Sequence, residues 1–250
     1  MNVADTSAST RGSSRELWFE IVSGGSGLAL ALFMWGHMFL VGTILFGERG
    51  FDWLAGGLEK LYIAQPTIVI IFILFLVHAV FASRKIPLQL RERKAMMKLA
   101  GNLRAVAFAS PNTAAPSVGT RPHLESWLWI WQVRTGMVML ILGTAHLVLI
   151  TVDIFTPMFG EVAGIEASSS MARVREWLML PYAVLLLCVE FHAGVGLYRL
   201  AVKWGFGAKL SRAALWRIEK LIFWTFLGLG IVILLVLAAW LPPPFAFMLE

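Results

Sequence analysis

Cysteine and charged side chains are scarce in this chain of 250 residues. Its one cysteine, Cys188, lies inside an apolar run, which excludes an internal disulfide, a thiolate-held iron–sulfur cluster and covalent haem of the CxxCH type. The sequence also has no dinucleotide-binding fingerprint. Only 14% of the residues are charged and 58% are hydrophobic, which is too apolar for a soluble domain of this size. The composition indicates a polytopic membrane protein whose redox cofactors, if any, have other ligands.

Five apolar runs are long enough to cross the hydrocarbon core of a membrane, which requires about 20 residues. We therefore predict an all-α membrane protein with five transmembrane helices. Residues 1–250 are expected to form a single membrane-anchor domain. The predicted helices cover about residues 21–46, 66–83, 127–151, 177–200 and 221–240.

Lysine and arginine are unevenly distributed between the connecting segments. Most of them lie between the second and third runs and around the fourth connection, and the N-terminal tail adds Arg11 and Arg15. The other two connections hold Arg49, Lys60, Arg173 and Arg175. Because basic residues are retained on the cytoplasmic side, we expect a cytoplasmic N-terminus and an outer C-terminus in the cytoplasmic (inner) membrane.

Each of the first four predicted helices contains one histidine. With this orientation, His37 and His146 lie in the outer half of the membrane, and His78 and His192 lie in the inner half. Two imidazoles leave a zinc or copper ion short of ligands, whereas a porphyrin supplies four more to haem iron. The pattern therefore favours two bis-histidine b haems over core histidines that only form hydrogen bonds.

Small and polar residues near the histidines fit such haems. Small residues flank the histidines, which allows a flat macrocycle close to the backbone: Gly36, Ala79, Gly143, Ala145, Ala193, Gly194 and Gly196. Candidates for the propionates of an inner haem lie near the cytoplasmic boundary: Ser23, Trp129, Lys203 and His123. Arg134 either joins them or extends to the interface. Arg173 and Arg175 either serve an outer haem or belong to a plain outer loop.

Two carboxylates lie in unusual places. Glu190 is close to the membrane centre, where a carboxyl group must be protonated or paired. It is either a proton relay or a neutral group bonded to a neighbouring helix. Glu59, in the first outer connection, either forms an interfacial charge pair with Lys60 or accepts a proton from a quinol hydroxyl as a general base.

Three stretches resemble a known family. They are "GLALALFMWGHMFLVGTILFG" around His37, "VHAVFASRKIP" around His78 and "CVEFHAGVGLYRLAVKWG" around His192. Weaker support comes from "WLWIWQVRTG", "GTAHL" and "SSSMARVREW". Over about residues 24–205 the chain resembles the dihaem cytochrome b subunit of menaquinol:fumarate reductases, within the succinate:quinone oxidoreductase superfamily.

The resemblance implies roles for individual residues. It implies two pairs of iron ligands, for a distal and a proximal haem respectively: His37 with His146, and His78 with His192. Glu59 stands where the family has a carboxylate implicated in menaquinol oxidation. Glu190 matches a helix glutamate thought to carry protons across the membrane, and Lys203 and Trp129 match positions that bind proximal haem propionates.

The resemblance also predicts the function. Menaquinol would be oxidised near the outer face, and electrons would pass through two b haems to an iron–sulfur subunit and then to a flavoprotein subunit that reduces fumarate, in anaerobic respiration. We expect membrane lipid around the chain and no nucleic-acid partner. The sequence is compatible with a dimeric complex but does not decide the oligomeric state. The alternatives are a succinate:quinone reductase running in the opposite direction, a dihaem cytochrome of another membrane dehydrogenase, and a haem-free proton-coupled transporter.

Overall fold

The computed structural model describes residues 3–84, 86–109, 124–156, 158–159, 164–206 and 208–249. Across these ranges it consists of helices and connections without strands. Five helical segments are long and apolar enough to cross a membrane, which confirms the predicted fold class. They are Ser14–Phe46, Ala64–Leu99, Ser126–Phe155, Ala167–Trp204 and Arg212–Leu237.

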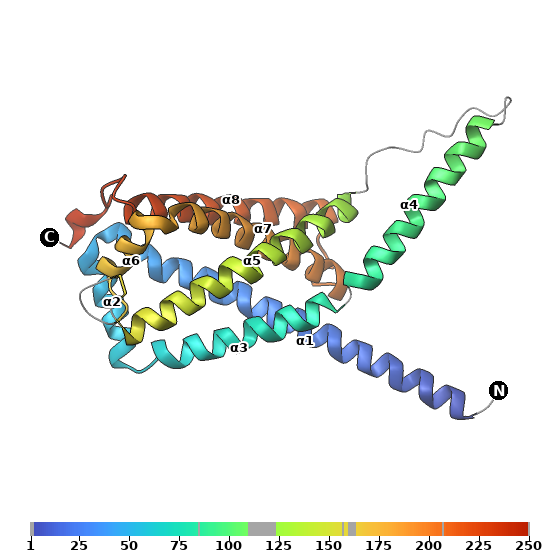
Figure 1. Cartoon of the computed structure of the whole chain (residues 1–250), viewed down its shortest axis with the longest axis horizontal. Coiled ribbons are helices and arrows are strands. Elements are labelled where there is room, and N and C mark those ends of the chain that lie inside the picture. Colours follow the sequence, from blue (N-terminus) through green and yellow to red (C-terminus); the bar gives the residue numbers. More distant parts are fainter. Residues whose placement is uncertain are drawn as a thin grey trace.

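Figure 1 shows the order of the helices along the chain. The α-helices are α1 (Val3–Gly42), α2 (Glu48–Lys60), α3 (Ala64–Ser83), α4 (Ile86–Ala109), α5 (Leu124–Phe155), α6 (Ala167–Arg173), α7 (Met179–Trp204) and α8 (Arg212–Leu237). Shorter turns of other helix types are η1 (Thr43–Phe46), η2 (Val174–Leu178) and η3 (Ala246–Met248).

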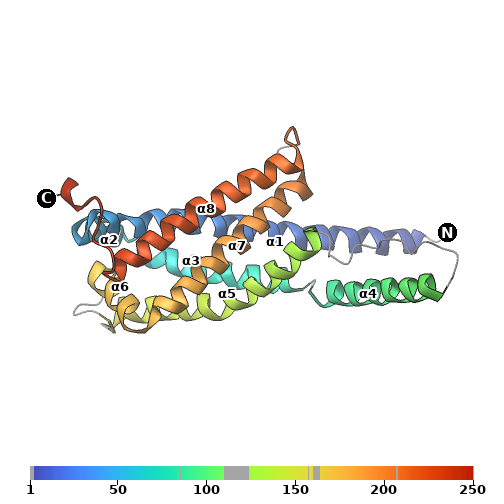
Figure 2. The ribbon, with the colours of Figure 1, turned by 90° about the horizontal axis from the view of Figure 1, so that it is seen from above.

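Four of the long helices surround a common axis. Helix α7 packs against α5 on one side and α8 on the other, and α1 packs against α3. Contacts between α3 and α5 and between α1 and α7 complete the ring, while α8 covers α1 and α7 (Figure 2). Helices α1 and α5 are therefore diagonally opposed, as are α3 and α7.

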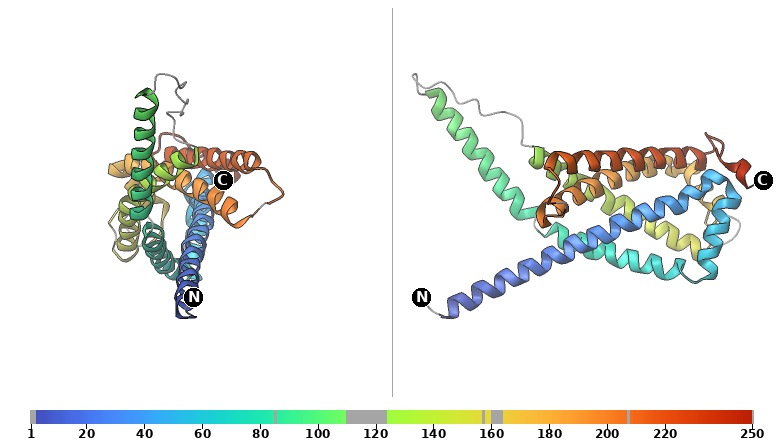
Figure 3. Two further views of the ribbon diagram at one scale, coloured as in Figure 1. Left: turned by 90° about the vertical axis from the view of Figure 1, so that its right-hand side faces the viewer. Right: turned by 180° about the vertical axis from the view of Figure 1, so that it is seen from behind.

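The bundle has two distinct ends. The first part of α1 and the whole of α4 project beyond one end, which we call the α4 end (Figure 3). Helices α2 and α6 and the C-terminal segment cover the opposite end, which we call the α2 end (Figure 1). The basic stretch after α3 is thus a helix that points away from the bundle.

Several helices extend beyond the apolar runs in the sequence. Helix α1 begins at Val3, well before the run that starts at residue 21. Helix α8 begins at Arg212, where the Ser211 hydroxyl accepts a hydrogen bond from the backbone N–H of Ala214 (3.1 Å), and it ends at Leu237. Hydropathy marks only the apolar part of a helix, since backbone hydrogen bonding continues into polar residues.

Large apolar side chains cover the outside of the bundle. On α3 alone, the exposed ones are Val69, Ile70, Ile73, Leu76 and Val80. A soluble monomer rarely exposes apolar patches of this extent. The exposed surface of α3 is therefore suited to lipid.

A buried ion pair joins α5 to α6 at the α2 end. The Arg173 guanidinium is paired with the Asp153 carboxylate, and the two residues are 4% and 2% exposed. Asp153 also accepts hydrogen bonds from the backbone N–H groups of Met158 (3.0 Å) and Phe159 (3.1 Å). Arg173 donates to the Ser170 hydroxyl (2.8 Å). This carboxylate therefore organises the connection that follows α5.

Asp153→Ala should destabilise the protein strongly, because it leaves the buried Arg173 charge without its partner. The expected loss is roughly 3–5 kcal/mol of the free energy of unfolding. Unfolding of the purified protein in detergent by chemical denaturant measures it. Arg175→Gln, at an exposed neighbouring position, is the control and should change the stability little. Equal stability of the two variants would contradict the importance of the ion pair.

Candidate haem-binding site

The structure brings His37 and His146 together near the α2 end. His37 lies on α1 and His146 on α5, the two diagonally opposed helices. The centres of their rings are 6.3 Å apart and the ring planes are 62° apart. The Tyr182 hydroxyl, on α7, lies 3.4 Å from Nδ1 of His146. We call these two histidines the outer pair, after the orientation that the sequence predicts.

His78 and His192 form a second pair nearer the α4 end, the inner pair. They lie on α3 and α7, with ring centres 6.2 Å apart and ring planes 88° apart. Nδ1 of His78 lies 3.1 Å from the carbonyl oxygen of Ser23, and Nδ1 of His192 lies 2.9 Å from that of Gln132. A carbonyl only accepts, so each Nδ1 carries the proton and Nε2 is left to bind a metal.

The ring spacing fits one metal ion between the rings of each pair. An imidazole nitrogen lies about 1.1 Å from its ring centre and a metal–nitrogen bond is about 2.0 Å, so two imidazoles on opposite sides of one metal have centres about 6 Å apart. Among the described residues, no three His, Cys, Asp or Glu side chains form a group that could hold a metal. A haem iron needs only the two imidazoles, because the porphyrin supplies its other four ligands.

Two glycines on neighbouring helices make room for the inner pair. A Cβ atom at Gly27 of α1 would lie 2.8 Å from the His78 ring, and one at Gly136 of α5 would lie 2.9 Å from the His192 ring. Gly27 and Gly136 were not identified from the sequence, which indicates only small residues close to each histidine along the chain. Of those, Gly194 contacts Glu219 and Gly196 contacts Gln132 instead. The signal in the sequence that could have identified Gly27 and Gly136 is a glycine on a neighbouring helix at the same membrane depth as the histidine.

Glu59 lies in the last turn of α2 and its side chain is half-buried. Its Oε1 atom accepts a hydrogen bond from the backbone N–H of Ile165 (2.9 Å), and both of its carboxylate oxygens lie close to Gly164. The neighbouring Lys60 is exposed. The carboxylate thus faces the backbone that leads into α6.

Glu190 is 2% exposed on α7, and its Oε1 atom has no hydrogen-bond partner within the described part of the chain. The side chain of Trp35, on α1, lies against the carboxyl group. A second buried carboxyl group, Glu219 of α8, lies close to the position that a Cβ atom would take at Gly194. Sequence reasoning missed Glu219 because it precedes the apolar run that begins at residue 221.

The described propionate candidates near the α4 end have different surroundings. Lys203 is exposed and forms an ion pair with Glu20 of α1. Trp129 is half-buried on α5. Ser23 holds the His78 ring through its carbonyl group, as described above. His123 lies outside the described residues.

Three arginines for which the sequence allows either a role at a haem propionate or a position at the interface or in a loop lie in different surroundings. Arg134 is exposed on α5, with its guanidinium 5.2 Å from the centre of the Trp131 ring, so it faces away from the bundle. Arg173 is buried in the ion pair with Asp153, and Arg175 is exposed. The positions of Arg134 and Arg175 favour their interfacial and loop interpretations.

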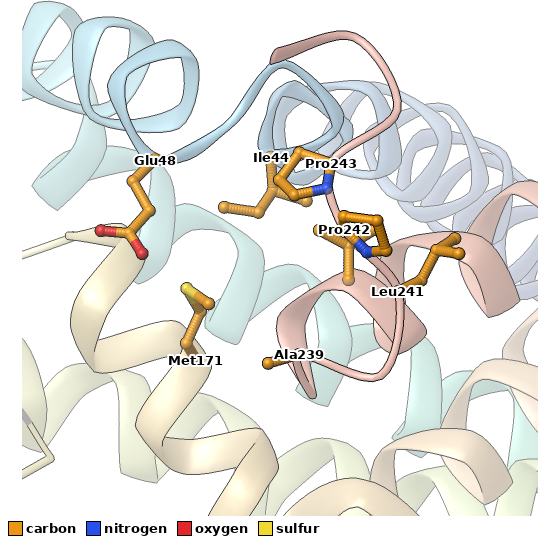
Figure 4. Close-up of a pocket in the computed structure, with 8 residues that line it drawn as sticks. Ile44, Glu48, Met171, Ala239, Leu241, Pro242 and Pro243 are labelled. Carbon is orange, nitrogen blue, oxygen red and sulfur yellow. The ribbon is translucent and has the colours of Figure 1, made fainter.

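A cavity of about 280 Å³ opens at the α2 end (Figure 4). Its lining is apolar except for the carboxylate of Glu48 at the start of α2. The lining residues are Ile44, Glu48, Met171, Val236, Ala239, Leu241, Pro242 and Pro243. Glu59 does not belong to this lining, so Glu48 and Glu59 lie in different surroundings on α2.

The fold and the paired histidines define a class, the multi-pass helical membrane proteins with histidine pairs inside the bundle. Residues 111–240 match the model of the family described as succinate dehydrogenase/fumarate reductase transmembrane subunit. The chain belongs to this family.

Two relatives give more detail. The fumarate reductase cytochrome b subunit of Wolinella succinogenes is 36% identical over an alignment of 188 residues, and the match covers 72% of this chain and 64% of the relative. This chain therefore spans somewhat less than two thirds of that relative's length. The subunit of the same name from Helicobacter pylori is 30% identical over an alignment of 220 residues, and the match covers 85% of this chain and 76% of the relative.

Gly27→Ala tests the space around the inner pair. The added methyl group would displace the His78 ring, so we expect less haem bound per chain and a weaker signal from the inner haem that the sequence predicts. Haem content and the reduced-minus-oxidised absorbance spectrum of the purified chain measure this. Gly25→Ala is the matched control, because nothing lies within 4 Å of a Cβ atom there. Equal haem content in the two variants would show that close contact at Gly27 is unimportant.

Proposed function

We propose that this chain is the dihaem cytochrome b membrane anchor of a menaquinol:fumarate reductase. The observation that carries the proposal is the meeting of four histidines in two pairs, with ring centres 6.3 and 6.2 Å apart at two levels of the bundle. The relatives, which are named fumarate reductase cytochrome b subunits, favour fumarate reduction over succinate oxidation.

The histidines would each bind haem iron through Nε2, His37 and His146 at the outer site and His78 and His192 at the inner site. The Ser23 and Gln132 carbonyl groups hold the inner rings by accepting from Nδ1. When bound, the two haems would supply one-electron transfer between a menaquinol site at the α2 end and an iron–sulfur subunit at the α4 end. Lys203 and Trp129 are our candidates for the inner propionates, together with Ser23 and His123.

Charge supports the α4 end as the cytoplasmic side of the inner membrane. Exposed basic side chains gather on the helices and connections of this end: Arg84, Arg91, Lys94, Lys98, Lys203, Lys209, Arg217 and Lys220. Basic residues stay on the cytoplasmic side, and they would also attract an acidic partner. In this orientation the α4 end receives the iron–sulfur subunit, and a flavoprotein subunit beyond it reduces fumarate.

Glu59 is our candidate for the proton acceptor in menaquinol oxidation. One carboxylate oxygen accepts from the Ile165 backbone N–H, and this bond fixes the position of the side chain. The other oxygen can accept the proton of a quinol hydroxyl, which is general-base catalysis. Holding the acceptor in place in this way favours proton transfer in a defined geometry.

Glu59→Gln should abolish menaquinol oxidation by the complex and leave both haems bound. The glutamine oxygen can still accept from Ile165, so the structural contact survives and only the base is lost. Reduction of the haems by a soluble menaquinol analogue measures the effect. Glu48→Gln, in the cavity of Figure 4, is the comparison variant and should retain activity. Loss of activity in Glu48→Gln with full activity in Glu59→Gln would move the quinol site to that cavity.

Glu190 is our candidate for a proton relay between the two faces. The group is buried, and its Oε1 atom has no hydrogen-bond partner among the residues that the structure describes, so this oxygen is available for proton transfer inside the membrane. Proton movement past this group would offset the charge that electron transfer carries across the membrane.

Glu190→Gln should slow menaquinol-driven fumarate reduction in sealed vesicles. Glutamine has about the same size as glutamate, but its amide does not ionise and so cannot take up and release a proton as a carboxyl group does. The haem spectrum of the same preparation shows whether both haems are retained. Turnover equal to that of the unaltered complex, with both haems present, would remove the relay from the account.

A further inference from the structure

Gln132 of α5 makes two hydrogen bonds to α7. Its carbonyl oxygen accepts from Nδ1 of His192 (2.9 Å), and its side-chain Oε1 accepts from Nη1 of Arg199 (2.6 Å). His192 and Arg199 lie two turns apart on the same face of α7. One residue of α5 therefore holds both a member of the inner pair and a cationic group next to it.

Close packing of α5 on α7 leaves these groups little freedom. A Cβ atom at Gly136 would lie 2.9 Å from the His192 ring, and one at Gly196 would lie 3.0 Å from Nε2 of Gln132. Each polar group is thus confined by a glycine of the opposite helix. The orientation of the His192 ring and that of the Gln132 amide are set by the same contact between helices.

The surroundings of His78, the other member of the inner pair, are different. Its Nδ1 atom lies 3.1 Å from the Ser23 carbonyl and 3.2 Å from the Ser26 hydroxyl, which are both neutral groups. On the other side, the Arg199 guanidinium is held by the same Gln132 whose carbonyl accepts from His192. The positive charge is consequently on the α7 side of the inner pair.

We propose that Arg199 and Gln132 form a clamp that positions His192 and places a positive charge beside the inner haem. The proposal rests on the proposed function, because it requires a haem between His78 and His192. A positive charge in a medium of low dielectric constant favours the haem state with one more electron. The clamp would therefore raise the reduction potential of the inner haem and fix the orientation of its ligand ring. Both residues are positioning residues, since they act through His192 and through charge.

The test is a spectroelectrochemical titration of the purified full chain. Arg199→Gln should shift the midpoint potential of the inner haem to a more negative value and leave that of the outer haem unchanged. Arg199→Lys keeps the charge and should restore most of the potential. Arg134→Gln is the matched control: it removes the same charge from α5 at an exposed position that faces away from the bundle, and it should leave both potentials unchanged. A His37→Ala background, which is expected to retain only the inner haem, assigns the shifted signal.

Gln132→Met keeps the backbone carbonyl and removes only the acceptor for Arg199, so it tests the clamp even if Arg199→Gln does not fold. We expect the electron paramagnetic resonance g values of the oxidised inner haem to change. Those of the outer haem should stay the same. Unchanged inner signals in Gln132→Met, or a shift of both haems alike in Arg199→Gln, would overturn the clamp. A wild-type chain without haem absorbance would instead overturn the proposed function on which the clamp rests.

Discussion

The separation of facing imidazole rings is the constraint on which the bundle depends. Each pair comes from diagonally opposed helices, α1 with α5 and α3 with α7, so a ring spacing of about 6 Å sets the width of the bundle at two levels. At the inner pair, glycines on the adjacent helices and carbonyl groups on Nδ1 follow from the same requirement. A wider or rotated bundle would separate the rings and lose both sites at once.

At the α2 end, carboxylates bind backbone N–H groups of the connection around α6. Asp153 binds those of Met158 and Phe159, Asp52 binds that of Ala167, and Glu59 binds that of Ile165. Buried or half-buried N–H groups need such acceptors. Glu59 therefore has a structural contact through one oxygen beside the chemical role that we propose for the other.

Hydropathy was sufficient to predict the number of membrane-spanning helices. The rise of 1.5 Å per residue was then sufficient to place His37 level with His146 and His78 level with His192. The sequence was insufficient for contacts that depend on how neighbouring helices are rotated. Gly27, Gly136 and Gln132 belong to this group, since nothing in their own helices marks them. Glu219 escaped notice because α8 begins well before its apolar run. The partner of Arg173 also depends on the path of a connection, which hydropathy does not give.

Haem stoichiometry tests the central claim most directly. We would purify the full chain, measure haem per polypeptide, and record the electron paramagnetic resonance spectrum of the oxidised protein beside that of His37→Ala. The account predicts two b haems per chain with two low-spin bis-histidine signals, and one haem with one signal in the variant. A chain without haem, or a His37→Ala variant that retains both signals, would contradict it.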